Sequence, residues 1–412
     1  MTSDSLREVA PPPGRGRRAL AGLRYGPLVL LVLCVVVATI LGRIEIRGER
    51  QDAERAAARA AAASEPVLPA VCAPPVDQGL TSEPWRDDSL EKASEATLAR
   101  RLAAEKPGYV SGRDGWKFFT DVQVSDFSQA LGRERLTKTP IKKWAAYLST
   151  MQREAEARGG KFYVMIAPAK WDVYPDKLPR WAQDLRGTNS LDSLMSTHPE
   201  LPFIDVRRAL RKAAKTEATY SPLDSHWTGY GGYVAWKAAT ACLRADGVDD
   251  ALRVPPITGV DRVDDRNEHA ADGVKLPDEP QWTVPVYATP HPATEVTDLR
   301  TGDAVPIGAD DTVDMLQLPV EARTTKAQTQ KTLLVLRDST GSALSPLWST
   351  SFARTFQYRH QIGDAESKPL DMKALIEKHR PDVTFFTMTE RYLAHDPPAV
   401  GAMTDPTPQE NP

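Results

Sequence analysis

The stretch from Leu333 to Ser339 reads LLVLRDS and decides the fold class. Its first four residues form a short apolar run that ends abruptly at the polar residues Arg337 and Asp338. A run of this length is typical of a strand that is buried on both faces of a parallel sheet. A serine placed where such a strand ends and a turn begins is where an activated nucleophile is usually held. Ser339 therefore becomes the first candidate for chemistry.

Similar runs recur along the chain, with helical patterns between them. Strands are expected at Lys161–Ala167, Pro202–Val206, Leu333–Leu336 and Val383–Met388. Helices are expected around Pro140–Ala157, in a basic segment ending near Lys215, and from Thr228 to Ala245. Short apolar strands that alternate with helices indicate an α/β fold, with a mostly parallel sheet flanked by helices. Ligands of such sheets bind beyond the carboxyl ends of the strands, where Ser339 lies.

A second stretch, Leu223-Asp224-Ser225-His226-Trp227, supplies an acid and a base two residues apart. Residues i and i+2 of an extended segment point to the same side, so Asp224 is able to reach one ring nitrogen of His226 and leave the other free. Together with Ser339 they are the parts of a Ser-His-Asp acyl-transfer site. We predict Ser339 as nucleophile, His226 as general base and Asp224 as the partner that orients the base.

Each of these residues also has a simpler interpretation. Asp338, Ser339 and Thr340 are residue types that cap the N-terminus of a helix, and that role is compatible with a nucleophile. His226 is alternatively a core histidine beside Trp227, or a metal ligand with Asp224. A zinc site needs a third and usually a fourth ligand, and the sequence offers no His-x-x-x-His or cysteine cluster. We therefore expect neither a metal nor a cofactor.

An acyl-transfer site also needs donors for the oxyanion that develops during the reaction. The backbone N–H of Ser339 or Thr340 is the first candidate donor. The second donor is sought among Arg337, Tyr358 and Arg391, between which the sequence does not choose. Lys170, near a strand end, either shapes the site or forms a surface salt link. Trp227 is expected to pack against the sheet and hold the edge of the imidazole, with sugar stacking as the alternative.

The N-terminus predicts a membrane anchor. Residues 1–24 are rich in Pro, Gly and Arg and are expected to form a disordered cytoplasmic tail. Residues 25–42 carry no charge, and at ~1.5 Å per residue they extend about 27 Å, close to the thickness of a bilayer core. The arginines before this run place the N-terminus in the cytoplasm and the remainder outside, as a single-pass protein of the cell membrane. The alternative is a cleaved signal peptide.

The remainder divides by composition. Residues 43–75 read as a solvated helical stalk followed by a Pro-rich linker, and residues 395–412 as a disordered tail. Residues 76–394 are long enough for one large α/β domain. Within it, residues 246–330 are rich in Asp, Pro and Thr. We interpret them as an irregular, strand-containing insertion that roofs the site or contacts substrate.

Charge and cysteine content give two further expectations. Lys and Arg total 52 and Asp and Glu total 55, a net charge of −3 that argues against nucleic acid as a partner. Cys72 and Cys242 are the two cysteines beyond the expected anchor. Outside the membrane such a pair is either bridged or present as two buried thiols, and the sequence leaves both readings open.

Several phrases also match one family in content and in order. They are Gly112–Phe119, Pro168–Lys170 leading to Val173–Pro179, Phe203–Val206, Asp224–Thr228, Asp338-Ser339 and Glu390–Leu393. The chain resembles the SGNH-hydrolase-like proteins of alginate O-acetylation, the AlgJ/AlgX-like group. In one position it departs from the pattern, because Arg337 stands where the family usually has glycine before the Asp-Ser pair.

The resemblance implies an O-acetyltransferase in which Ser339, His226 and Asp224 carry the reaction. It implies a polysaccharide as acceptor, exported or on the cell surface, and a membrane-bound O-acyltransferase that supplies the acetyl groups. The expected anchor, in place of a soluble periplasmic form, favours a polysaccharide other than alginate. Two alternatives stay open: an acetylesterase of the same chemistry, and a non-catalytic scaffold that binds polysaccharide or the acyltransferase, which the Arg337 departure favours.

Overall fold

A computed structural model describes residues 68–80, 83–85, 88–106, 108–308, 310–364 and 369–400. The expected cytoplasmic tail, the expected anchor and most of the expected stalk therefore lie outside the described residues, as do residues 401–412. Within the part that is described, no helix combines the length and the apolar character needed to cross a bilayer.

A central sheet of six strands organises the domain, in the order β3-β10-β8-β9-β7-β6. Its strands are β3 (Lys161–Ala167), β6 (Thr294–Asp298), β7 (Val320–Thr324), β8 (Thr329–Arg337), β9 (Phe352–Arg359) and β10 (Val383–Thr389). The four strands from β3 to β9 are parallel to one another. β7 and β6 continue the sheet in antiparallel pairing. The expected α/β fold is present, and its sheet is mixed.

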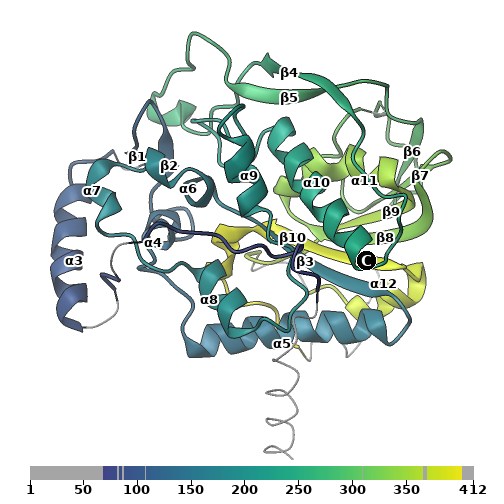
Figure 1. The fold of residues 1–412 in the computed structure, drawn as a ribbon, viewed down its shortest axis with the longest axis horizontal. Coiled ribbons are helices and arrows are strands. Elements are labelled where there is room, and N and C mark those ends of the chain that lie inside the picture. Colours follow the sequence, from purple (N-terminus) through teal and green to yellow (C-terminus); the bar gives the residue numbers. More distant parts are fainter. Residues whose placement is uncertain are drawn as a thin grey trace, which may run out of the picture. The chain divides into compact units, whose positions relative to one another are not determined.

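Helices cover both faces of this sheet, as Figure 1 shows. One face carries α9 (Arg207–Ala213), α10 (Gly229–Ala245) and α11 (Ser345–Ser351), and the other carries α5 (Lys138–Glu156), α8 (Ser190–Thr197) and α12 (Met372–His379). The other α-helices of the described residues are α3 (Asp88–Leu102), α4 (Asp126–Ala130), α6 (Lys170–Val173) and α7 (Arg180–Gln183). The 3₁₀ helices are η1 (Pro175–Lys177), η2 (Ala270–Asp272), η3 (Met315–Gln317), η4 (Ser339–Leu344) and η5 (Glu390–Ala394).

The strands show why both faces need a helical cover. Leu333 and Val335 of β8 point into the core under α10, while Leu334 and Leu336 point into the core under α5. Side chains alternate between the faces of a strand, so an apolar residue at every position requires a cover on both sides. The continuous apolar run of the sequence is explained by this arrangement.

Two expectations differ from the structure. Pro202–Val206 forms no strand of the sheet, and only a single parallel bridge joins Phe203 to Val164 of β3. Residues 246–330 are only partly an insertion, because β6 and β7 belong to the central sheet. β6 is the edge strand and β7 is its inner neighbour, and polar residues interrupt both. Neither strand therefore shows a continuous apolar run in the sequence.

The remaining strands form two small sheets. β1 (Tyr109–Ser111) pairs with β2 (Lys117–Phe119), and β4 (Ile257–Val263) pairs with β5 (Trp282–Tyr287), both antiparallel. In Figure 1 the β4–β5 pair lies above α10, away from the central sheet. This pair is the part of residues 246–330 that stands outside the main layers.

A disulfide joins Cys72 to Cys242 of α10, with 4.7 Å between their Cα atoms. Cys72 is buried, and its carbonyl accepts a hydrogen bond of 2.8 Å from the N–H of Asp205. The last residues of the expected Pro-rich linker are therefore part of the folded domain. The structure selects the bridged alternative for this cysteine pair.

We predict that the Cys72→Ala/Cys242→Ala variant loses about 5 kcal/mol of stability by the chain-entropy relation, because the bridge closes a loop of 170 residues. Urea unfolding of the oxidised protein, the reduced protein and the double variant measures this loss. Equal transition midpoints for all three would contradict a stabilising role.

Candidate active site

Ser339 lies at the carboxyl edge of the central sheet, as the first residue of η4 directly after β8. Asp338 caps this 3₁₀ helix: its Oδ1 accepts hydrogen bonds from the N–H of Thr340, at 2.9 Å, and from the Thr340 hydroxyl. The capping interpretation of the sequence therefore holds for Asp338. It coexists with a Ser339 side chain that is only partly buried.

Asp224 and His226 lie in the loop between α9 and α10, just before the Thr228 cap of α10. The Oδ1 atom of Asp224 accepts two hydrogen bonds from His226, one from the backbone N–H at 2.7 Å and one from ring Nδ1 at 2.8 Å. The first bond fixes the turn and the second fixes the ring. Asp224 is buried, with only 2% of its surface exposed, so water does not compete for this contact.

The other ring nitrogen of His226 faces the serine. The Nε2 atom lies 2.8 Å from Ser339 Oγ. Asp224, His226 and Ser339 thus form one hydrogen-bonded chain. His226 and Ser339 are 113 positions apart in the sequence. With Nδ1 protonated and donating to the Asp224 carboxylate, Nε2 is free to accept from Ser339, and this is the tautomer that a general base requires.

The ionised forms of Asp224 and His226 stabilise each other. Burial works against ionisation of Asp224, but its hydrogen bonds with His226 and the charge of the imidazolium lower the pKa of its carboxyl below the usual value. Burial also opposes the charged form of His226, yet the Asp224 hydrogen bond and carboxylate, helped by Glu268, raise its pKa. Both directions favour an imidazolium beside a carboxylate, the state that forms when Ser339 loses its proton.

Glu268 is a site residue that sequence reasoning missed. Its Oε1 lies 3.7 Å from His226 Nδ1, and its two carboxylate oxygens accept hydrogen bonds from the N–H of Ser225 at 2.5 Å and from the Ser225 hydroxyl at 3.0 Å. Its own N–H donates to the carbonyl of Leu223 at 3.1 Å. A single glutamate in a segment rich in acids gives no sequence signal, because its contact depends on the path of the chain after β4.

Trp227 connects the loop of the base to the loop of the nucleophile. Its indole Nε1 donates a 2.9 Å hydrogen bond to the carbonyl of Thr340. The ring is 1% exposed, so it packs as expected and also fixes the distance between His226 and Ser339. The alternative of sugar stacking has little support, since almost no face of the ring is open.

Arg337 is excluded as an oxyanion donor. Its guanidinium is fully buried and donates to Gln357 Oε1, to Ser342 Oγ and to the backbone carbonyls of Val313 and Asp338. Burial lowers its pKa to about 10, which still leaves it charged at neutral pH. The residue that departs from the family pattern therefore supports the serine loop from beneath.

Gly341 is the compensating residue for this arginine. A Cβ atom at position 341 would lie 2.2 Å from Cδ of Arg337 and 3.0 Å from Trp348. The stem of the buried arginine occupies the space that a side chain would need. Glycine is therefore required here by close packing.

Tyr358 is also excluded from the site. Its hydroxyl is 2.7 Å from Nε2 of His379 in α12, and its ring belongs to the core under α5 and α12. Its hydroxyl is therefore already engaged by His379.

The remaining donors are one backbone group and one arginine. Within the described part of the chain, the N–H of Ser339 donates no hydrogen bond, whereas the N–H of Thr340 donates to Asp338. The guanidinium of Arg391 lies over the rings of Phe119 and Tyr392 at 5.6 and 5.7 Å. Its positive charge opposes protonation of His226, so it acts on the site electrostatically.

Lys170 lies behind the Asp224 loop. It is buried at 4% exposure, and its Nζ donates a 3.0 Å hydrogen bond to the carbonyl of Pro222. The rings of Phe118 and Trp116 lie 5.4 and 5.9 Å from the same atom. Burial lowers its pKa to about 8. Lys170 therefore positions the loop that carries Asp224 and forms no surface salt link.

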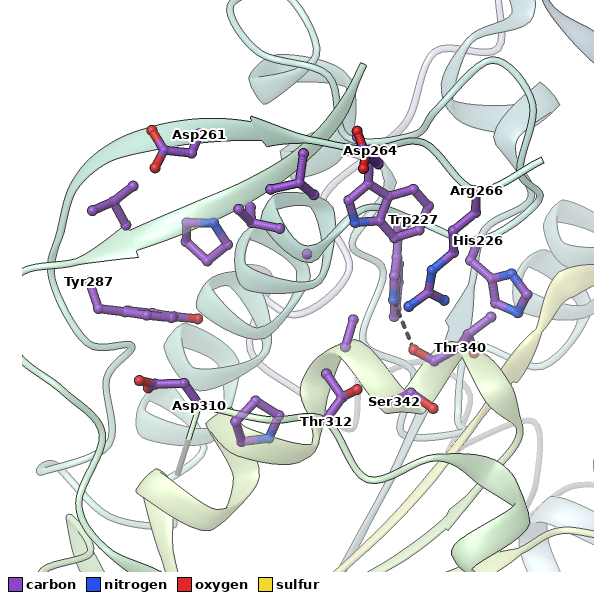
Figure 2. Close-up of a pocket in the computed structure, with 18 of the residues that line it drawn as sticks. His226, Trp227, Asp261, Asp264, Arg266, Tyr287, Asp310, Thr312, Thr340 and Ser342 are labelled. Carbon is purple, nitrogen blue, oxygen red and sulfur yellow. Dashed lines mark hydrogen bonds between the residues drawn. The ribbon is translucent and has the colours of Figure 1, made fainter. Parts of the chain in front are cut away.

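A cavity of about 730 Å³ opens beside Ser339 and His226. Figure 2 shows His226 and Thr340 near one end and Tyr287 and Asp310 toward the other, with the β4–β5 strands passing over it. Residues of β4 and β5 therefore line one side of the cavity.

Among the described residues, one group of side chains places its ligand atoms close enough together to hold a cation. It consists of Asp224, His226 and Glu268. Each of these atoms already has a hydrogen-bond role in the arrangement above. His226 Nδ1 is bonded to Asp224, and the Glu268 carboxylate is bonded to Ser225. The donor set fits an acid–base chain better than a closed metal site.

Comparison with protein families matches residues 109–298 to the model described as the SGNH hydrolase-like domain of acetyltransferase AlgX. The match includes Asp224 and His226 and ends before Ser339. A probable alginate O-acetylase AlgJ of Pseudomonas aeruginosa is 28% identical over 206 residues, which are 49% of this chain and 48% of that protein. This chain therefore spans about half the length of that relative.

Two solved structures share the fold. PatB1 of Bacillus cereus, with a sulfonyl adduct, has a TM-score of 0.50 at 13% identity and covers 72% of this chain and 98% of its own. A DHHW family protein from Eubacterium siraeum has a TM-score of 0.50 at 16% identity. The match covers 73% of this chain and 96% of that protein. At this level of identity the likeness concerns the fold alone.

We predict that Gly341→Ala destabilises the protein by roughly 1–3 kcal/mol, since the added methyl group overpacks against Arg337. Gly259→Ala is the matched control, because a Cβ at that position of β4 meets no atom within 4 Å. Thermal unfolding of both variants measures the difference. Equal melting temperatures would contradict the packing role of Gly341.

We predict that Glu268→Gln lowers the pKa of His226, because it removes a negative charge 3.7 Å from Nδ1. NMR titration of the imidazole measures this, with His226→Ala identifying the signal. In the wild type the midpoint is expected above the usual value for histidine, and in the variant at a lower pH. Glu279→Gln, an exposed acid distant in sequence, should leave the midpoint in place. An unchanged midpoint in Glu268→Gln would refute the charge effect.

Proposed function

We propose that this chain, which is AlgJ/AlgX-like in sequence and SGNH-like in fold, is an O-acetyltransferase that acts on a polysaccharide outside the cytoplasm. The observation that carries the proposal is the hydrogen-bonded chain Asp224–His226–Ser339 at the end of an open cavity. A scaffold would need neither the buried carboxylate nor the imidazole aligned on an accessible hydroxyl.

The reaction would proceed in two steps with Ser339 as the nucleophile. Ser339 Oγ attacks the acetyl carbonyl of the donor while its proton passes to His226 Nε2, and the donor's acyl bond breaks as the leaving group takes that proton. In the second step His226 removes the proton of a sugar hydroxyl. The sugar oxygen then bonds to the acetyl carbon, the acyl–Oγ bond breaks, and the proton returns to Ser339.

The oxyanion of both steps would be stabilised by the N–H of Ser339, which has no partner among the described residues. Arg391 is the second donor that we propose, since Arg337 and Tyr358 are held elsewhere. Its guanidinium is held by stacking on Phe119, with no ion pair among the described residues to fix it. It would therefore be available to a charge that develops at Ser339.

The setting of the reaction is also part of the proposal. Residues 25–42 would anchor the chain in the cell membrane, with the domain on the outer side. A membrane-bound O-acyltransferase would supply the acetyl groups from the cytoplasm. The disulfide between Cys72 and Cys242 supports an oxidising compartment.

We predict that 4-nitrophenyl acetate acetylates the full-length chain once, and that Ser339→Ala and His226→Ala abolish this reaction, with a fall in rate of ~10³-fold or more. Intact-mass spectrometry detects the acetyl group, and nitrophenol release gives the rate. Ser196→Ala, which removes an exposed hydroxyl from α8, is the control and should react like the wild type.

The outcomes distinguish the three functions. Acetylation that a sugar discharges faster than water supports the transferase, and discharge by water alone supports the acetylesterase. A folded Ser339→Ala protein that still sustains polymer acetylation in cells would refute both enzymatic functions and leave the scaffold.

A further inference from the structure

The cavity beside Ser339 has an apolar inner wall formed by β5. Val284, Val286 and Tyr287 line it from this strand, whereas the ring of Trp282 is buried and covered by Arg266. Aromatic and aliphatic side chains in an extended pocket suit the C–H faces of sugar rings. A volume of about 730 Å³ accommodates more than one sugar ring, so the cavity is large enough for a segment of a glycan chain.

The charged residues of the cavity are mostly acidic. Asp261, Asp264 and Asp310 line it, and Arg266 is the one lysine or arginine among its described lining residues. Figure 2 shows Asp261 and Asp264 along the β4 side of the cavity, and Asp310 on the far side near Tyr287. An occupant therefore meets carboxylates on two sides.

The two carboxylates on the β4 side of the cavity are not neutralised by cations of the described residues. Asp261 and Asp264 form no ion pair or hydrogen bond through their side chains with any described residue. The side chain of Asp310 is 60% exposed and lies 3.2 Å from Nδ1 of His291. The guanidinium of Arg266 stacks on Trp282 at 4.8 Å and forms no ion pair with them. The negative charge of the cavity thus exceeds its positive charge.

We propose that the cavity binds a glycan that carries no carboxylates, whose hydroxyl or amino groups donate hydrogen bonds to Asp261, Asp264 and Asp310. This inference rests on the proposed function and specifies its acceptor. A polyuronate bears one carboxylate on every sugar, so it would bring like charges into the cavity at each residue. A neutral or amino-bearing sugar chain supplies the donors that carboxylates require.

The first test measures binding without chemistry. The full-length Ser339→Ala chain is titrated calorimetrically with cello-oligosaccharides, chitosan oligosaccharides and mannuronate oligosaccharides of equal length. Cello- or chitosan oligosaccharides are expected to bind at least ~10-fold more tightly than the mannuronate series. Comparison of the cello-oligosaccharides with the chitosan oligosaccharides separates hydroxyl donors from ammonium donors. Mannuronate binding that is equal or tighter overturns the proposal, and so does the absence of binding in all three series.

The second test uses charge variants in the same Ser339→Ala background. Asp261→Asn/Asp264→Asn is expected to increase mannuronate affinity by about 3–10-fold, and added salt should reduce this difference because it screens the repulsion. Asp278→Asn removes an exposed carboxylate that does not line the cavity and is the matched control. If the double variant and the control bind mannuronate alike, the carboxylates do not set the preference and the proposal fails.

Acetylation of the wild type by 4-nitrophenyl acetate tests the proposed reaction separately from the proposed acceptor. If Ser339 is acetylated but mannuronate oligosaccharides discharge the acetyl group as fast as cello- and chitosan oligosaccharides do, the acceptor inference fails and the transferase stands. If carboxylate-free glycans bind as expected but Ser339 is never acetylated, the inference about the cavity stands and the proposed reaction fails.

Discussion

The buried carboxylate of Asp338 is the constraint on which the site depends. One oxygen accepts from the N–H and hydroxyl of Thr340, and the other accepts a 2.7 Å hydrogen bond from the N–H of Thr389 at the end of β10. Burial opposes its charge, but its contact with His360 and these hydrogen bonds hold the pKa of Asp338 well below its usual range. It therefore stays ionised in the core. The ends of β8 and β10 and the first turn of η4 are fixed relative to one another through this one group.

The neighbouring Arg337 shows how a sequence departure is absorbed by packing. A glycine before the Asp-Ser pair would leave space beneath the turn, and here the arginine fills it and donates to the carbonyls of Val313 and Asp338. The filled space in turn requires Gly341 above it. The departure therefore changes how the serine loop is supported, while Ser339 keeps its 2.8 Å contact with His226.

The sequence predicted those parts of the fold that a regular pattern governs. The bounds of β3, and the positions of β8, β10, α5 and α10, follow from apolar runs and helical composition. The strands β6 and β7 were missed because polar residues interrupt both, so neither contains a continuous apolar run. Of the candidate site, the spacing of Asp224 and His226 and the position of Ser339 after a strand could be read locally. Glu268, and the exclusion of Tyr358, depend on which chain segments meet in space, and no local pattern encodes that.

The order of the strands sets when the site is able to form. β8 is flanked in the sheet by β9 and β10, both of which follow it in the chain, and the last bond to Asp338 comes from Thr389. A chain that is made or exported from its N-terminus therefore presents His226 and Ser339 before β9 and β10 are available to support them. Contacts of such large sequence separation form late, because the intervening loops must close first. The alignment of Ser339 with His226 is thus acquired only when the domain is nearly complete, so an unfinished chain carries the same side chains without their arrangement.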